Sequence, residues 1–268
     1  MRNAAARAVL SLALCLAGRA AAVGAEPDAA ELAKRAVAAA FGTDAVEVWK
    51  SDWQGQELSF GVARRHENGK LELYVRVFAP HKYDPLGFLI AAHKDGLPGV
   101  LYYRSPRVFP PSPLTGRTLE VETASALEPL PFAPGLPSLV DLWPPRAQDV
   151  TVARLADDAS DGTPCRALES RLETKDGAYD RIVSLLAKDS DLALETRYYR
   201  GDKLVRKVTI AAADVDTSGG HAIARKRVVE KTGEPPQVLS LERFSLDPVF
   251  PDQLFTSLNL RAGRFPSY

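Results

Sequence analysis

Residues 56–79 read QELSFGVARRHENGKLELYVRVFA, and this stretch decides the fold class. Apolar side chains recur at every second position on both sides of a central Asn68-Gly69 pair. Such alternation is typical of β-strands. An Asn-Gly pair accepts the positive φ angles that a tight hairpin turn requires. The stretch therefore predicts an antiparallel hairpin with strands at 56–64 and 71–79.

The segment before this hairpin has a helical pattern instead. Residues 29–41 place Leu32, Val37 and Phe41 among many alanines, Asp28 is a suitable N-cap, and Gly42 is a suitable end. We expect a helix over 29–41. After the hairpin, residues 87–93 and 100–104 have the pattern of two further strands.

The second half of the chain continues the strand pattern. Seven short runs are separated by turn signals such as Asp161-Gly162, Asp176-Gly177 and Ser218-Gly219-Gly220. We expect strands at 151–155, 165–173, 179–188, 192–200, 203–212, 221–231 and 237–246. Regular spacing of this kind indicates an antiparallel meander. A total of roughly eleven strands is enough to curl into a barrel or a half-barrel.

The middle of the chain has a different composition. Ten prolines lie between Ser105 and Pro145, and proline does not donate to a strand ladder. Residues 105–145 should therefore form loops and short helices, including one or two helical turns over 138–143. Because this insert is rich in apolar residues, we expect it to pack against the rest of a single domain that spans 26–268.

The first 25 residues have the order of a secretory signal peptide. Arg2 and Arg7 precede an apolar run, and Val23-Gly24-Ala25 provides small residues before a cut ahead of Glu26. Removal of three arginines from the 34 basic residues leaves 31 against 34 acidic residues, a net charge of −3. This charge argues against a nucleic-acid-binding protein. The mature chain keeps only Cys165, which we expect to be a buried apolar residue rather than a reactive thiol.

Residue patterns that indicate catalysis are missing from the sequence. None of His66, His81, His93 and His221 stands at metal-ligand spacing from another histidine or from Cys165. The sequence has no nucleophile-elbow, phosphate-loop or dinucleotide motif. We therefore expect no enzyme activity, no cofactor and no metal site.

Several strands are apolar on both faces for part of their length, as in Ile182-Val183 and Leu185-Leu186. A sheet that is covered on one side should alternate more cleanly. Two explanations are open at this point. The proline-rich insert and the first helix either complete a filled core, or they cover a curved sheet and leave an apolar cavity.

Four short motifs in the second half follow one another in a characteristic order. They are Tyr179-Asp180-Arg181-Ile182, Leu194-Glu195-Thr196-Arg197-Tyr198-Tyr199, Lys203-Leu204-Val205-Arg206-Lys207-Val208 and the close Phe250-Pro251-Asp252-Gln253-Leu254-Phe255-Thr256-Ser257-Leu258-Asn259-Leu260. In this order the chain resembles the outer-membrane lipoprotein-sorting proteins of the LolA-like group. The resemblance covers most of 150–260, is looser over 44–110 and is weakest over the proline-rich 111–145.

The resemblance implies a strongly curved antiparallel half-barrel with helices and loops as a lid. It implies a hydrophobic cavity for a lipid or lipoprotein acyl chain, in the periplasm of a Gram-negative cell. An inner-membrane lipid-exporting permease is an implied partner, and we expect a monomer that binds no nucleic acid. We expect the lining of the cavity to include Phe60, Val62, Leu73, Val75, Val77, Leu89, Leu101, Tyr103, Leu139, Leu142 and Trp143.

The functional hypothesis is therefore a periplasmic carrier that takes an acyl chain from one envelope component and hands it to another. The alternative is an interaction module with a filled core, for example an accessory subunit of an envelope lipid-export complex. Lipid that co-purifies with the protein favours the carrier, whereas a solid core favours the interaction module.

Overall fold

The computed structural model describes residues 26–80, 86–92, 98–104, 118–121, 130, 135–144, 150–172 and 178–266. The helices are α2 (Ala29–Phe41), α3 (Leu139–Leu142), α4 (Ser257–Ala262) and the 3-10 helix η4 (Ala212–Asp214). The strands are β1 (Ala45–Trp53), β2 (Gln56–Glu67), β3 (Lys70–Ala79), β4 (Leu86–Ala92), β5 (Pro98–Arg104), β6 (Thr118–Val121), β7 (Val150–Arg154), β8 (Asp158–Ser160), β9 (Thr163–Leu172), β10 (Arg181–Ala187), β11 (Ala193–Arg200), β12 (Lys203–Thr209), β13 (Val215–Ser218), β14 (His221–Ala224), β15 (Lys226–Lys231) and β16 (Gln237–Leu246).

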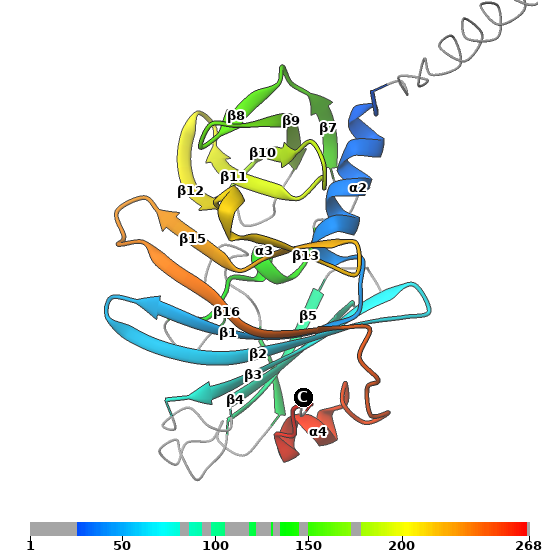
Figure 1. The fold of residues 1–268 in the computed structure, drawn as a ribbon. Helices are drawn as coiled ribbons and strands as arrows, with labels where there is room; N and C mark the ends of the chain where they lie inside the picture. The colour runs from blue at the N-terminus through cyan, green and yellow to red at the C-terminus, as the bar shows by residue number, and fades with distance from the viewer. Residues whose placement is uncertain are drawn as a thin grey trace, which may run out of the picture.

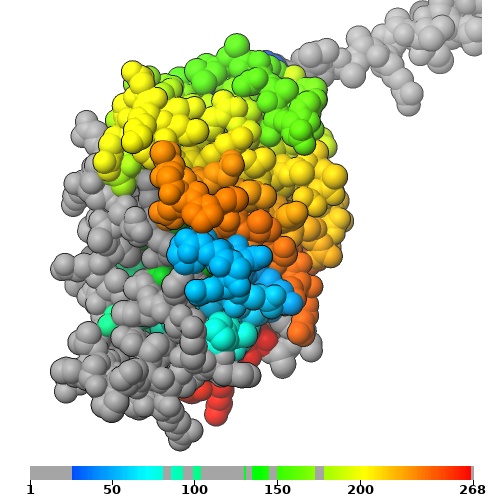
Figure 2. Space-filling view, turned by 90° about the vertical axis from the view of Figure 1, so that its left-hand side faces the viewer, coloured from blue at the N-terminus to red at the C-terminus, as the bar shows by residue number. Residues whose placement is uncertain are grey.

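One large antiparallel sheet dominates the molecule (Figure 1). Its 14 strands follow the order β6-β5-β4-β3-β2-β1-β16-β15-β12-β11-β10-β9-β7, with β8 attached to β9. The pairing of β1 with β16 joins the two series of hairpins into a single surface. The turn ends of the β1–β2 and β15–β16 hairpins accordingly lie side by side in Figure 2. The sheet is strongly curved and does not close, so the predicted half-barrel is confirmed.

The number of strands exceeds the predicted eleven because four strands and the division of a fifth were not predicted. The missed strands are β1, β6, β8 and β13, and the predicted strand 221–231 is divided into β14 and β15. β1 lacks clean alternation because it is buried on both faces. The bulge in its pairing with β16 adds a residue to β16, where Glu242 has no partner in β1. β6 lies at an edge of the sheet, a position compatible with its proline-rich surroundings.

The predicted hairpin is confirmed as the β2–β3 pair. Asn68 has φ +52° and Gly69 has φ +73°, and Glu67 pairs with Lys70 across the turn. Both central residues are therefore in the left-handed region that a two-residue hairpin turn requires. A Cβ atom at Gly69 would contact no atom within 4 Å, so only the backbone conformation restricts this position.

Replacing Gly69 with valine should lower the free energy of unfolding by about 1–3 kcal/mol, because a β-branched residue resists a positive φ angle. Gly69→Asn is the matched control and should cost less, since asparagine tolerates this conformation. Urea denaturation of the two variants measures the difference. Equal midpoints for wild type and Gly69→Val would contradict the turn conformation.

Helices cover both faces of the sheet. The predicted helix 29–41 is confirmed as α2, which begins where Asp28 accepts a hydrogen bond of 2.8 Å from the Glu31 amide. Leu32 of α2 is fully buried against Leu168 and Leu186. In Figure 1, α3 lies inside the curve of the sheet and α4 lies outside it. We call these two sides the concave and the convex face.

The C-terminal segment, from Phe250 to Phe265, covers the convex face over β1–β5. Leu254, Phe255 and Leu260 form a buried cluster with the outward side chains Val46, Ala63, Tyr74 and Leu89. Gly61 permits the close approach of this segment, because a Cβ atom there would lie 2.4 Å from the ring of Phe265. The concave face is instead covered by the short helix α3 and by the end of α2.

Candidate binding site on the concave face

The concave face of β1–β5 is a continuous apolar wall. Strand pairing brings Phe60 opposite Val77, Val62 opposite Val75, and Val75 opposite Phe88. These side chains belong to the largest buried cluster among the described residues, which also includes Leu239 and Leu241 of β16. The predicted turn of helix at 138–143 is confirmed as α3, and it covers this wall.

Residues 135–144, here called the covering segment, supply the facing side chains. Leu136, Leu139 and Leu142 are buried in the same cluster as the wall, and Trp143 packs against it. α3 is only four residues long, and Ser138 and Asp141 form a capping box at its start. A cover of this length has few backbone hydrogen bonds, so it opens at a lower free-energy cost than the sheet.

Eight of the eleven predicted lining residues face this shared interior. They are Phe60, Val62, Leu73, Val75, Val77, Leu139, Leu142 and Trp143. The other three, Leu89, Leu101 and Tyr103, lie on the convex face against the C-terminal segment. Their placement corrects the predicted orientation of β4 and β5, where Phe88, Ile90, Val100 and Tyr102 are the inward residues.

Two buried polar contacts attach the covering segment to the sheet. Arg206 of β12 is 1% exposed, and its Nη2 atom donates to Asp141 Oδ1 over 2.5 Å. Gln237 of β16 donates to Ser51 Oγ over 2.9 Å and to the Gly135 carbonyl over 2.6 Å. Burial opposes the charge of Arg206, but the neighbouring Asp141 carboxylate holds the pKa of this guanidinium above its usual value. The covering segment is therefore attached to the sheet near both of its ends by buried polar groups.

Tyr198 of β11 lies beside the Arg206–Asp141 pair. The Arg206 guanidinium carbon lies 5.1 Å from the Tyr198 ring centroid, and Tyr179 meets the same ring edge to face at 5.3 Å. Burial raises the pKa of Tyr198 to about 12. The phenol therefore stays neutral in the folded protein at pH values where it ionises in the unfolded chain.

This shift predicts a loss of stability at alkaline pH. Between pH 10 and 12 the unfolded chain releases the Tyr198 proton and the folded protein keeps it, so stability falls as the pH rises, by up to about 3 kcal/mol. Tyr198→Phe should show a smaller decline over the same range. Denaturant midpoints at pH 8, 10 and 11.5 measure the difference, and parallel declines would contradict a buried neutral phenol.

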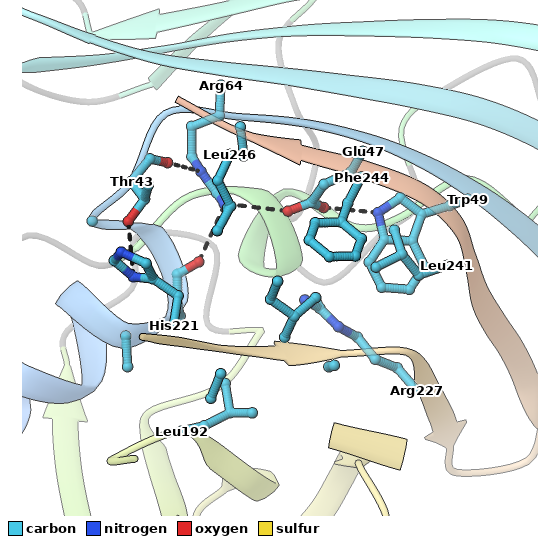
Figure 3. A pocket seen from close by; sticks show the side chains of 17 residues that line it. Thr43, Glu47, Trp49, Arg64, Leu192, His221, Arg227, Leu241, Phe244 and Leu246 are labelled. Carbon is cyan, nitrogen blue, oxygen red and sulfur yellow. Dashed lines mark hydrogen bonds and ion pairs between the residues drawn. The ribbon is translucent and has the colours of Figure 1, made fainter. Parts of the chain in front are cut away.

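Two small pockets lie between the end of α2 and the sheet, and the second of them also contacts the covering segment. Each has a volume of about 50 Å³. The first, here called the hairpin pocket, extends toward β14 and includes His221, Phe244 and Leu246 (Figure 3). The second, here called the lid pocket, extends along the apolar wall and includes Phe60, Val62, Leu73 and Leu142. Both pockets are lined by Ala40, Glu47, Trp49, Arg64 and Arg227.

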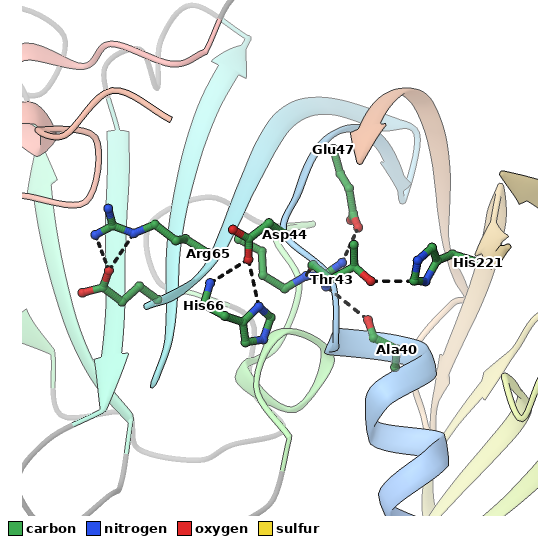
Figure 4. Close-up of polar contacts among 9 residues, drawn as sticks. Ala40, Thr43, Asp44, Glu47, Arg65, His66 and His221 are labelled. Atoms are coloured by element: carbon green, nitrogen blue, oxygen red, sulfur yellow. Dashed lines mark hydrogen bonds and ion pairs between the residues drawn. The ribbon is translucent and has the colours of Figure 1, made fainter. Parts of the chain in front are cut away.

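The shared polar residues form a defined network at the end of α2 (Figures 3 and 4). Arg64 donates to the carbonyls of Ala40 and Thr43 over 3.2 and 3.0 Å, and so satisfies acceptors that the helix end leaves open. Glu47 accepts from Arg64 over 3.2 Å and from Trp49 Nε1 over 2.8 Å. Both Glu47 oxygens are therefore occupied.

The pocket volumes bear on the choice between a cavity and a filled core. An apolar cavity of about 150 Å³ holds one benzene molecule, and typical ligand pockets measure about 300–1,000 Å³. A long acyl chain therefore needs more space than either of these two pockets offers.

The remaining candidate groups have ordinary structural contacts. His66 Nδ1 lies 2.9 Å from Asp44 Oδ1, and His221 Nδ1 lies 3.2 Å from Thr43 Oγ1 (Figure 4). His81 and His93 lie outside the described residues. Among the residues that the structure describes, no three metal-binding side chains gather at one place. Cys165 is fully buried as expected, and this burial raises the pKa of its thiol.

Sequence patterns did not reveal the polar residues of the site. Arg206 and Arg227 occur in strands with charged residues on both faces, and Asp141 is 65 positions away from its partner. Strand alternation is the signal that could have found these residues. Arg206 lies on the same face of β12 as Val208, and Arg227 lies on the same face of β15 as Val229. Alternation places these arginines in the interior only when the inward face of each strand is already known.

Comparison with solved structures identifies the architecture. A DUF1329 family protein of Desulfovibrio piger aligns with a TM-score of 0.72 and 18% sequence identity, over 87% of this chain and 97% of its own. A candidate outer-membrane lipoprotein-sorting protein domain of Vibrio parahaemolyticus aligns with a TM-score of 0.72 and 15% identity, over 87% and 98% of the two chains. A LolA superfamily protein of Nitrosomonas europaea aligns with a TM-score of 0.60 and 13% identity, over 86% and 98%.

The chain has the LolA-like fold. The resemblance predicted from the order of the motifs is thus confirmed at the level of structure. No protein-family model matches the sequence, and no curated protein matches it either. In this LolA-like half-barrel the candidate site is the interior between the sheet and its cover. Within the described residues, no helix is long and apolar enough to cross a membrane.

Proposed function

We propose that this protein is a periplasmic carrier that holds the acyl chain of a lipid or lipoprotein against its concave face and hands it to another envelope component. The observation that carries the proposal is the apolar wall of β1–β5, over which the described residues place a four-residue helix and no second sheet. When the cover moves, this wall is available to a ligand of matching chemistry.

The energetics suit transfer. Burial of an acyl chain contributes about 0.8 kcal/mol per CH₂ group before the costs of binding are subtracted. A chain of about fourteen carbons then gains about 10 kcal/mol, part of which offsets the displacement of Leu139 and Leu142 from the wall. An acyl chain that displaces the covering side chains is therefore bound with moderate net affinity. Moderate affinity allows the protein both to take the chain from a donor and to release it to an acceptor.

Uptake of an acyl probe tests the proposal. Mature protein that has been stripped of lipid should bind a fluorescent fatty acid, and organic extracts of the untreated protein should contain lipid by mass spectrometry. Absence of both signals would contradict the carrier. The interaction module would then replace it, and the small pockets of about 50 Å³ are the observation that favours this second function.

The proposed location requires export. Residues 1–25 lie outside the described residues, and α2 begins shortly after the expected cleavage site, at Ala29. Protein recovered from the periplasm should begin at Glu26 on N-terminal sequencing, because Ala25 is the last small residue of the signal. Retention of Met1 in a cytoplasmic protein would contradict this prediction. A lipid-exporting permease as donor, and a monomeric state, are further parts of the proposal.

A further inference from the structure

Arg227 of β15 stands apart from the other cations of the site. It lines both pockets, and Figure 3 shows its side chain pointing into the hairpin pocket below Trp49. Its guanidinium carbon lies 4.9 Å from the centroid of a Trp49 ring. Its Nε atom is buried, and no described residue accepts a hydrogen bond from it. Arg64 and Arg206, by contrast, each pair with a carboxylate.

The carboxylates nearby are already occupied. Glu47 binds Arg64 and Trp49 with its two oxygens, and Asp141 binds Arg206 and the Ser138 amide with its two oxygens. Among the described residues, three guanidinium groups therefore face two carboxylates, and the half-buried Arg227 is the one without a carboxylate partner. A buried donor without an acceptor destabilises the protein, so a ligand that supplies an acceptor gains affinity there.

The chemistry of the missing group follows from the side chain. A guanidinium presents its N–H donors as a planar fork that matches the two oxygens of a carboxylate or a phosphate. The apolar part of the lid pocket begins beside it, with Phe60, Val62 and Leu239 as neighbours. A ligand with an oxyanion at one end and an alkyl chain at the other satisfies both parts at once.

We propose that Arg227 binds the oxyanion head group of an amphiphile whose acyl chain lies along the β1–β5 wall. This inference rests on the proposed carrier function and names its ligand class, a single-chain amphiphile with a carboxylate or phosphate head. The head group would lie against Trp49 and Arg227. The chain would extend past Val62 into the space that Leu142 now occupies.

Three amphiphiles of matched chain length, tetradecanoate, tetradecyl phosphate and tetradecanol, test the assignment together with inorganic phosphate. Calorimetric titration of the delipidated mature protein should show both charged amphiphiles binding about tenfold or more tightly than tetradecanol. Arg227→Gln should remove this preference and leave the affinity for tetradecanol unchanged. Arg227→Lys should keep part of the preference. Lys226→Gln, an equal charge change at an exposed neighbour on the other face of β15, should behave as wild type.

Each other outcome has a distinct meaning. Equal affinity of wild type and Arg227→Gln for tetradecanoate overturns the head-group site and leaves the carrier standing. Inorganic phosphate that displaces tetradecanoate from the protein overturns the amphiphile in favour of a free anion. Failure of all three amphiphiles to bind overturns the carrier and this inference together. If Arg227→Gln does not fold, the wild-type preference for charged over neutral probes and the Arg227→Lys variant decide the question.

Discussion

Replacing Asp141 with asparagine should lower the free energy of unfolding by about 3–5 kcal/mol, which is the usual cost of removing one partner from a buried ion pair. Arg206 is 1% exposed and stays charged, so the variant leaves a guanidinium in the interior without its counter-ion. Asparagine keeps an oxygen for the Ser138 amide, so the start of α3 stays capped. Urea denaturation measures the effect.

Two controls separate this effect from a general loss of charge. Asp216→Asn removes the partner of Arg225 in an exposed pair, and it should cost at most about 1 kcal/mol. Asp141→Asn combined with Arg206→Met removes both charges, and it should be more stable than Asp141→Asn alone. If Asp141→Asn costs less than about 1 kcal/mol, the pair is not what holds the covering segment.

The same variant should loosen the cover locally. The Trp143 amide donates to the Leu139 carbonyl within α3, so its hydrogen exchange reports the opening of this helix. Exchange at Trp143 should accelerate in Asp141→Asn more than exchange in β2 or β3. A uniform acceleration would show instead that the whole domain opens as one unit.

The parts of the fold that sequence could predict are those with a local cause. Asn68-Gly69 sets a turn by its own backbone preferences, and Asp28 caps α2 within three residues. β1 has no such local signal. Val46 packs on the convex face and Trp49 on the concave face, so a strand buried on both sides shows no alternation.

The candidate site was predictable only as far as face alternation allows. Phe60 and Val75 follow from the clean pattern of the β2–β3 hairpin. In β4 and β5 both faces are apolar, since Phe88 lies inward and Leu89 packs outward under the C-terminal segment. A strand of this kind does not reveal its inward face, because a shift of one residue exchanges the two sets. The positions of Arg206, Asp141 and Arg227 could not be predicted for a related reason, because they depend on which inward-facing residues meet across the curved sheet.

The location of the ligand gives the prediction with the largest effect on function. Val62 is 4% exposed, lies on the wall and lines the lid pocket, whereas Val46 is fully buried on the convex face. Valine to phenylalanine at either position adds the same volume to a packed interior and should cost about 1–3 kcal/mol of stability.

Only one of these two variants should affect binding. Val62→Phe fills the lid pocket of about 50 Å³ and narrows the path along the wall, so uptake of a fluorescent fatty acid should fall about tenfold or more. Val46→Phe places its ring behind the sheet, where it meets the C-terminal segment, and uptake should stay at the wild-type level. Titration of both delipidated variants, after circular dichroism has shown that they fold, makes the comparison. Equal loss in the two variants would attribute the effect to overpacking alone, and no loss in Val62→Phe would place the acyl chain elsewhere than on the concave wall.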